Sequence, residues 1–155
     1  MSVKYSLIPM KIKNIYNCDM NNQESNWGPG IYDNDDVMDW IYDLAEDGGL
    51  AALMEALDVV IKNKNEDIEI SDCRIGLAAA DLVAALNGDI NPDLPEEAED
   101  WVAMISKTAE SLRPKAEEAV HKILNGSPLR DEWISANDFL LWEKAIDDLS
   151  KRLEL

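Results

Sequence analysis

The residues of this chain best suited to act together are carboxylates at helical spacing. Asp35, Asp39 and Asp43 stand at successive i, i+4 positions, so a helix through them places the three side chains on one face. Like charges at this spacing destabilise an isolated helix by about a few tenths of a kcal/mol per pair, which favours a use other than stability. The alternative is a plain solvated face, the commoner role of a charge run. We expect a partner to contact this row and four further residues: Trp27, Asp36, Glu46 and Asp47.

The chain holds few residues for other kinds of chemistry. Nucleophilic catalysis by a Ser-His-Asp set or a Cys-His pair needs an imidazole base, and the single histidine is His121. Its neighbours Glu117 and Glu118 indicate a solvated helix surface. Cys18 and Cys73 are far apart in sequence and form no CxxC pair, so they offer no zinc or redox motif, and a single disulfide between them stays open. We therefore expect a protein that is not an enzyme and has no catalytic residues, no metal and no cofactor.

The segment 89–100 has a weak likeness to a calcium-binding loop. Oxygen-bearing side chains stand at loop positions 1, 3, 5, 9 and 12, namely Asp89, Asn91, Asp93, Glu97 and Asp100. Leu94, however, takes the sixth position, where such a loop needs glycine, and Asp100 replaces the bidentate glutamate. These mismatches argue against calcium binding here.

The charge of the chain is large and uneven. Its 32 Asp and Glu outweigh 14 Lys and Arg, which gives a formal net charge of -18. Direct binding of nucleic acid requires a cationic surface, so this acidity excludes it. Neither Lys nor Arg occurs from residue 14 through 61 or from 75 through 106. Such one-sided charge accelerates encounter with a cationic partner, so we expect a basic protein as the partner.

The elements that position these residues are predicted to be helices. Apolar residues recur at helical spacing in helices expected near 35–46, 50–63, 71–86, 95–105, 111–124, 128–134 and 138–153. Asn34 or Asp33 is the expected cap of the first, and Ser71 or Asp72 that of the third. We predict an all-α, compact single-domain bundle of six to seven short helices, with the alanine-rich third helix at its centre.

Residues 1–26 differ from the helical domain, which we place at residues 27–155. Their β-branched and aromatic residues are interrupted by Pro9, which favours a short N-terminal β element. Lys11 and Lys13 break the apolar run that a signal peptide needs. No stretch of the chain approaches the roughly 20 apolar residues of a membrane-spanning helix. We expect a cytoplasmic protein that does not bind membranes.

The segment from Trp27 to Trp40 reads WGPGIYDNDDVMDW. It resembles the opening signature of the bacterial family called domain of unknown function 4259, with its Trp-Gly-x-Gly turn, aromatic residue, Asn-Asp pair and Asp-Trp pair. The matching residues are Trp27, Gly28, Gly30, Tyr32, Asn34, Asp35, Asp39 and Trp40. The likeness continues in LAAADLVAALNG, PDLPEEAEDWV, DEW and DDLSKRL. The resemblance implies a compact helical domain of unassigned activity, so no catalytic residue is carried over, and the 26-residue extension departs from it.

Three classes of function remain open from the sequence. The first is an acidic protein-binding domain, such as an immunity protein or inhibitor that covers the cationic active face of a basic toxin, for example a nuclease. The second is a nucleic-acid mimic that acts on a DNA-binding or phage-defence protein, with carboxylates in phosphate positions. The third is a metal-dependent enzyme that uses the carboxylates, or a housekeeping domain. The charge pattern favours the first class, with Trp27 as an aromatic anchor beside the acidic helix.

Overall fold

Helices are the only regular elements in residues 28–154, the part of the chain that the computed structural model describes. The α-helices of this part are α1 (Asp35–Asp47), α2 (Leu50–Lys62), α3 (Ile70–Leu86), α4 (Glu96–Ile105), α5 (Arg113–Asn125), α6 (Pro128–Ser135) and α7 (Phe139–Leu153). Two 3-10 helices, Asn65–Asp67 and Glu110–Leu112, precede α3 and α5. The predicted all-α class is confirmed. The expected β element of residues 1–26 lies outside the described residues.

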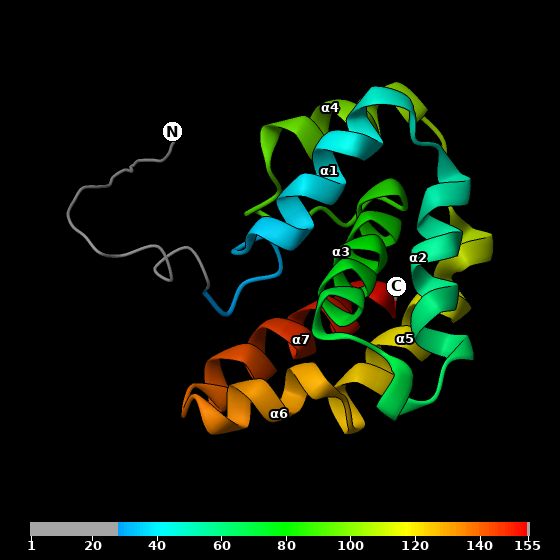
Figure 1. The fold of residues 1–155 in the computed structure, drawn as a ribbon. Helices are drawn as coiled ribbons and strands as arrows, with labels where there is room; N and C mark the ends of the chain where they lie inside the picture. The colour runs from blue at the N-terminus through cyan, green and yellow to red at the C-terminus, as the bar shows by residue number, and fades with distance from the viewer. Residues whose placement is uncertain (1–27, 155) are drawn as a thin grey trace.

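The central element is α3, which packs against each of the other six α-helices (Figure 1). Twelve of its 17 residues are buried, and small side chains such as Ala78, Ala79 and Ala84 line it. Small residues let neighbouring helix axes approach closely. The predicted central position of this alanine-rich helix is therefore confirmed.

Capping side chains fix where the helices begin. The Asn34 side-chain oxygen accepts the Val37 N–H at 2.9 Å, so Asn34 is the cap of α1 and Asp33 is not. The expected cap of α3 was wrong, because the helix already begins at Ile70. Asp72 instead accepts the backbone N–H of Glu69 at 3.1 Å, which satisfies one of the free donors at the helix start.

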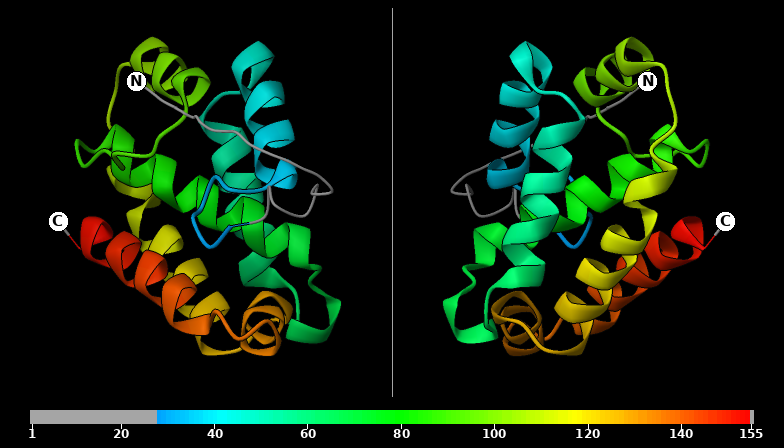
Figure 2. Two further views of the ribbon diagram at one scale, coloured as in Figure 1. Left: turned by 90° about the vertical axis from the view of Figure 1, so that its left-hand side faces the viewer. Right: turned by 90° about the vertical axis from the view of Figure 1, so that its right-hand side faces the viewer.

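The helices divide the molecule into two ends. Figure 2 shows α1 and α4 side by side at one end and α6 and α7 together at the other. The turn 28–34 leads from the first described residue into α1 and lies beside α7, with which it lines two pockets (Figure 1). In the described residues, no helix combines the length and the hydropathy that crossing a membrane requires.

Candidate interaction surface

The outer side of α1 carries a continuous row of exposed carboxylates. The buried side of the helix holds the apolar residues Val37, Ile41 and Leu44. The exposed acids of the helix, which we call the acidic face, are Asp35, Asp39, Asp43, Glu46 and Asp47. Within residues 28–154 none of these five forms an ion pair with a Lys, Arg or His. The acidic face therefore presents five carboxylates to solvent, none of them paired with a cation of residues 28–154.

An aromatic side chain stands in the middle of the acidic face. Tyr42 follows Asp39 by three residues and precedes Glu46 by four, so its side chain lies between theirs on the helix surface. It is 49% exposed. Tyrosine is enriched among the residues that carry binding energy at protein interfaces, because its ring packs and its hydroxyl donates a hydrogen bond. Tyr42 was not among the predicted contact residues, although its spacing relative to the acids is visible in the sequence.

Asp36 differs from the other acids of α1, because it is held by a cation. The guanidinium of Arg74, on α3, lies 3.2 Å from the Asp36 carboxylate and 2.9 Å from that of Glu132 on α6. The Arg74 side chain is only 11% exposed. Asp36 therefore joins α1 to α3 and α6, and we assign it to the fold rather than to the acidic face. Trp27, the other expected contact residue, lies outside the described residues.

The neighbouring helix α4 extends the negative charge. It packs against α1 and exposes further carboxylates at Glu96, Glu99 and Asp100. Residues 28–61 contain nine Asp and Glu and residues 75–106 contain seven, without a single Lys or Arg. The contact between α1 and α4 thus places the exposed carboxylates of these two helices together at one end of the molecule.

The turn before α1 is built around the carboxylate of Asp33. Gly30 donates its N–H to that carboxylate at 3.0 Å, and the backbone N–H of Gly28 bonds to the Asp33 carbonyl at 3.0 Å. A Cβ at Gly28 or Gly30 would stand 2.8 or 2.6 Å from a carboxylate oxygen of Asp33. A side chain at either position would displace the Asp33 carboxylate, so the Gly-x-Gly pattern leaves room for this carboxylate against the turn.

Tyr32 leads from this turn to a buried polar cluster. Its hydroxyl donates to the carboxylate of Asp81 at 2.6 Å, and Asn91 donates to the other oxygen at 3.4 Å. A guanidinium nitrogen of Arg152 lies 2.6 Å from the Asp81 carboxylate and forms an ion pair with it. The geometry of this contact does not meet that of a hydrogen bond. Asp81 is fully buried. Burial raises the pKa of Asp81, and Arg152 opposes that shift.

A surface pocket of about 390 Å³ lies beside this cluster. Asp33 and Asp93 line one part of it, and Lys144, Asp148 and Arg152 of α7 line another. The Arg152 guanidinium is already held by Asp81 and by Asp148 at 3.2 Å. The lining combines three carboxylates with two cations, so it does not select one sign of charge. It contains no thiol or imidazole.

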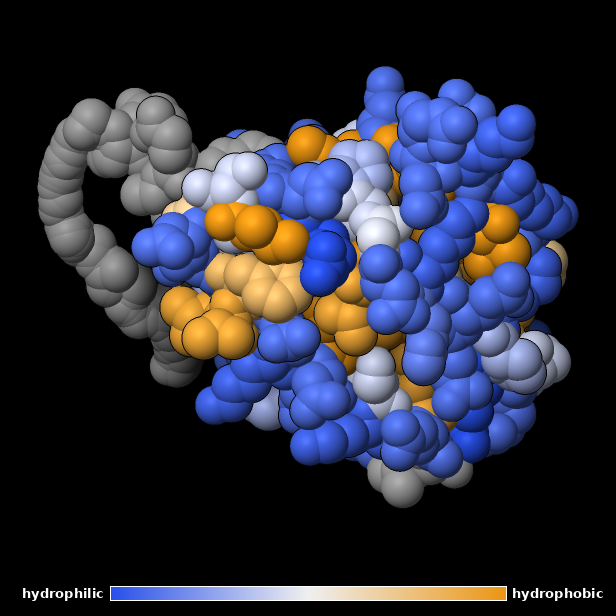
Figure 3. Space-filling view, turned by 90° about the horizontal axis from the view of Figure 1, so that it is seen from below, coloured by the Kyte–Doolittle hydropathy of each residue, from blue (hydrophilic) through white to orange (hydrophobic). Residues whose placement is uncertain are grey.

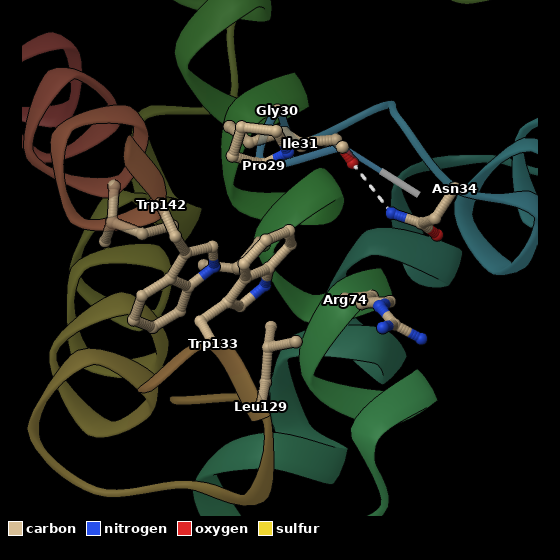
Figure 4. Close-up of a pocket in the computed structure, with 11 residues that line it drawn as sticks. Pro29, Gly30, Ile31, Asn34, Arg74, Leu129, Trp133 and Trp142 are labelled. Carbon is tan, nitrogen blue, oxygen red and sulfur yellow. Dashed lines mark hydrogen bonds between the residues drawn. The ribbon is translucent and has the colours of Figure 1, made fainter. Parts of the chain in front are cut away.

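A second, much narrower cavity lies under the glycine turn. Figure 4 shows Trp133 and Trp142 on one side of it, Pro29 to Ile31 above and Arg74 opposite. The Asn34 side-chain amide donates to the Ile31 carbonyl at 3.5 Å across its rim. The volume of about 20 Å³ is enough for roughly one water molecule. The two tryptophans therefore serve to hold the turn, and the cavity is too small for an organic ligand.

The remaining candidate residues do not converge. His121 is exposed on α5, and Cys73 is buried in α3. Burial raises the pKa of the Cys73 thiol, so its nucleophilic thiolate form is disfavoured. Of the loop 89–100, Asn91 points into the polar cluster with Asp81. In the described residues no three His, Cys, Asp or Glu side chains are grouped as a metal ion requires.

A family model described as Domain of unknown function (DUF4259) matches residues 25–145. The chain belongs to this family. No curated protein and no solved structure matches the chain. The DUF4259 match includes the glycine turn, the acidic face and Asp81, and ends before Arg152. The family description gives no activity.

Proposed function

We propose that this DUF4259 protein is a protein-binding domain that docks a basic protein on its acidic face. The observation that carries the proposal is the row of five exposed carboxylates on α1 that no cation of the described chain neutralises. Like charges held at that spacing cost helix stability, whereas they attract a cationic surface across solvent. The absence of basic residues from residues 28–61 and 75–106 extends the attraction over the end formed by α1 and α4.

The partner that fits such a surface is a protein with a cationic active face. A toxin that cleaves nucleic acid needs such a face to hold phosphates, and a domain that covers it would act as an inhibitor or immunity protein. Binding would proceed by electrostatic steering, followed by docking around Tyr42, the exposed aromatic residue in the acidic face.

The steering step is tested by charge reversal. In Asp39→Lys with Asp43→Lys, we expect the association rate with the partner, isolated by affinity capture at low salt, to fall about tenfold or more. The slope of that rate against salt should also decrease. The matched control is Glu118→Lys with Asp131→Lys, which changes two exposed acids of α5 and α6 and the net charge equally. Equal effects of the two pairs on the association rate would rule out the acidic face as the docking surface.

The docking step is tested by Tyr42→Ala. Loss of a central aromatic contact raises the dissociation rate more than it changes the association rate, so we expect dissociation about tenfold faster or more. The variant should fold normally, because the side chain is half exposed.

Duplex DNA serves as a competitor in the same assay. If it displaces the domain from a partner without nuclease activity, the nucleic-acid mimic replaces the toxin inhibitor as the proposed function.

A further inference from the structure

A cluster of apolar side chains is exposed at the junction of α6 and α7, opposite the acidic face. Ile134 is 46% exposed, Leu140 77% and Leu141 57%, and Phe139 is partly buried between them and the core. We call these four residues the apolar corner. They line a hollow of about 360 Å³. Figure 3 shows the corner as a group of orange side chains at the left of the face seen from below.

The core of the domain does not need this corner. The buried residues of α7 are Trp142, Ile146, Leu149 and Leu153, which already form a complete helical stripe. Leu140 and Leu141 precede this stripe and point elsewhere. Each exposed leucine leaves apolar surface in water at a cost of about 25 cal/mol per Å². Grouped exposed apolar residues of this kind mark an interaction site.

The corner is held in one shape. The Phe139 ring lies 5.8 Å from the Trp142 ring, centroid to centroid and tilted by 47°. The Arg130 guanidinium covers the Phe139 ring at 5.2 Å, a cation–π contact. Phe139 is therefore fixed from the core side and from the solvent side. A surface that is ordered before binding loses less conformational entropy on binding.

We propose that the apolar corner is the contact surface of a symmetric dimer of this chain. In such a dimer the same patch meets itself, so it must be self-complementary. Charges of both signs border the corner, since Asp138 lines the hollow and Arg130 covers Phe139, so each copy brings a cation and an anion to a two-fold contact. Residues 107–154 hold eight basic and ten acidic residues and are nearly neutral. The acidic face, in contrast, repels its own copy.

The dimer is expected to be weak. Three exposed side chains cover far less than the roughly 800 Å² per partner of a standard interface. The net charge of -18 on each copy also opposes association through long-range repulsion, which salt screens. Association through the apolar corner should therefore strengthen as salt is added, whereas a contact made by ion pairs would weaken.

The test is sedimentation equilibrium of the full chain over three decades of concentration, at low and high salt. We expect reversible dimerisation, stronger at high salt, and about tenfold weaker dimerisation in Leu140→Asp. Met104→Asp is the matched control, since Met104 is 65% exposed on α4 and the variant adds the same charge. It should dimerise like the wild type. A chain that stays monomeric throughout, or a dimer that Met104→Asp weakens and Leu140→Asp does not, overturns the proposal.

A second measurement distinguishes contact with a second copy from contact with another segment of the same chain. At concentrations where the wild type is monomeric, Leu140→Asp should leave the melting temperature within a few degrees, because Leu140 is exposed in the monomer. A large drop would mean that the corner is covered within one chain, and it would exclude the dimer. Neither result bears on the acidic face, whose test is the association rate with the basic partner.

Discussion

At the scale of single residues, the most demanding feature is the buried carboxylate of Asp81. An isolated charge in a core is costly, and here it is offset by Tyr32, Asn91 and Arg152. Removing one partner of such a cluster leaves the others buried with unmet hydrogen-bonding capacity. The cluster joins the glycine turn to α3 and α7, so its integrity positions the start of α1.

Tyr32→Phe tests this cluster at neutral pH. The variant keeps the ring and removes the hydroxyl that donates to Asp81 at 2.6 Å, so we expect a loss of about 2 kcal/mol in the free energy of unfolding, as for hydrogen bonds to charged groups. Urea denaturation followed by circular dichroism measures it. Tyr42→Phe is the control, because Tyr42 is half exposed and its change should be small. Equal effects of the two variants would contradict the role of the cluster.

The same tyrosine predicts a dependence of stability on alkaline pH. Burial, followed by the nearby charge of Asp81, raises the pKa of Tyr32 well above its ordinary value. Above about pH 10 the unfolded chain loses this proton while the folded chain keeps it, so stability falls as pH rises through that window. In Tyr32→Phe the fall should be shallower. Parallel stability curves for the two proteins above pH 10 would contradict the shift.

The sequence predicted part of this chemistry. The exposure of Asp35, Asp39 and Asp43 followed from helical spacing, which fixes the side of a helix on which a residue lies. The cluster around Asp81 was missed, although a lone acid within LAAADLVAALNG is a signal that it needs a buried partner. Its partner Arg152 comes from a helix 71 residues further along the chain, and no local pattern identifies such a pairing.

At the scale of the elements, the close packing of α2 on α3 depends on Gly76. A Cβ at this position would lie 2.6 Å from a methyl group of Val60, closer than van der Waals contact permits. Gly76 lies within α3 and is buried, although glycine costs about 1 kcal/mol in a helix relative to alanine. The contact with α2 therefore accounts for glycine at a position where helix propensity favours alanine.

Gly76→Ala should destabilise the domain by about 1 kcal/mol or more, because overpacking at Val60 outweighs the gain in helix propensity. Thermal denaturation measures the change. In a Val60→Ala background, which removes the obstructing methyl groups, Gly76→Ala should become neutral or stabilising. Destabilisation that persists in this background would show that the close contact is not the cause.

The helices themselves were largely predictable, because apolar periodicity and capping residues are local signals. Which side chains of each helix face the core was less predictable. Helical spacing alone groups Leu141 with the core residues of α7 and Met104 with those of α4, yet both are exposed. At a helix end the neighbouring element can be too short to cover an apolar residue. Which apolar residues stay exposed depends on tertiary packing that periodicity does not contain.

At the scale of the whole molecule, the charge is distributed along one axis. The two helices α1 and α4 at one end contain no Lys or Arg, while the cations of the described chain come from residues 62–74 and 107–154. Several of them form ion pairs within the fold, such as Lys115 with Asp58 at 2.5 Å. The hydrogen bond from Lys115 lowers the pKa of Asp58. In residues 28–61 only Asp36 and Asp58 form ion pairs. Repulsion between carboxylates is therefore concentrated on the acidic face.

This distribution predicts that salt stabilises the folded domain. A net charge of -18 destabilises the compact state through self-repulsion, and ions screen it over a Debye length of about 10 Å at 0.1 M salt and about 3 Å at 1 M. We expect the melting temperature to rise by several degrees between low salt and 1 M sodium chloride, measured by calorimetry at one protein concentration. Asp39→Lys with Asp43→Lys should show a smaller rise than the control Glu118→Lys with Asp131→Lys. If repulsion were spread over the whole surface, the position of the reversed acids would not matter. The salt-induced rise in melting temperature would then be equal in the two double variants.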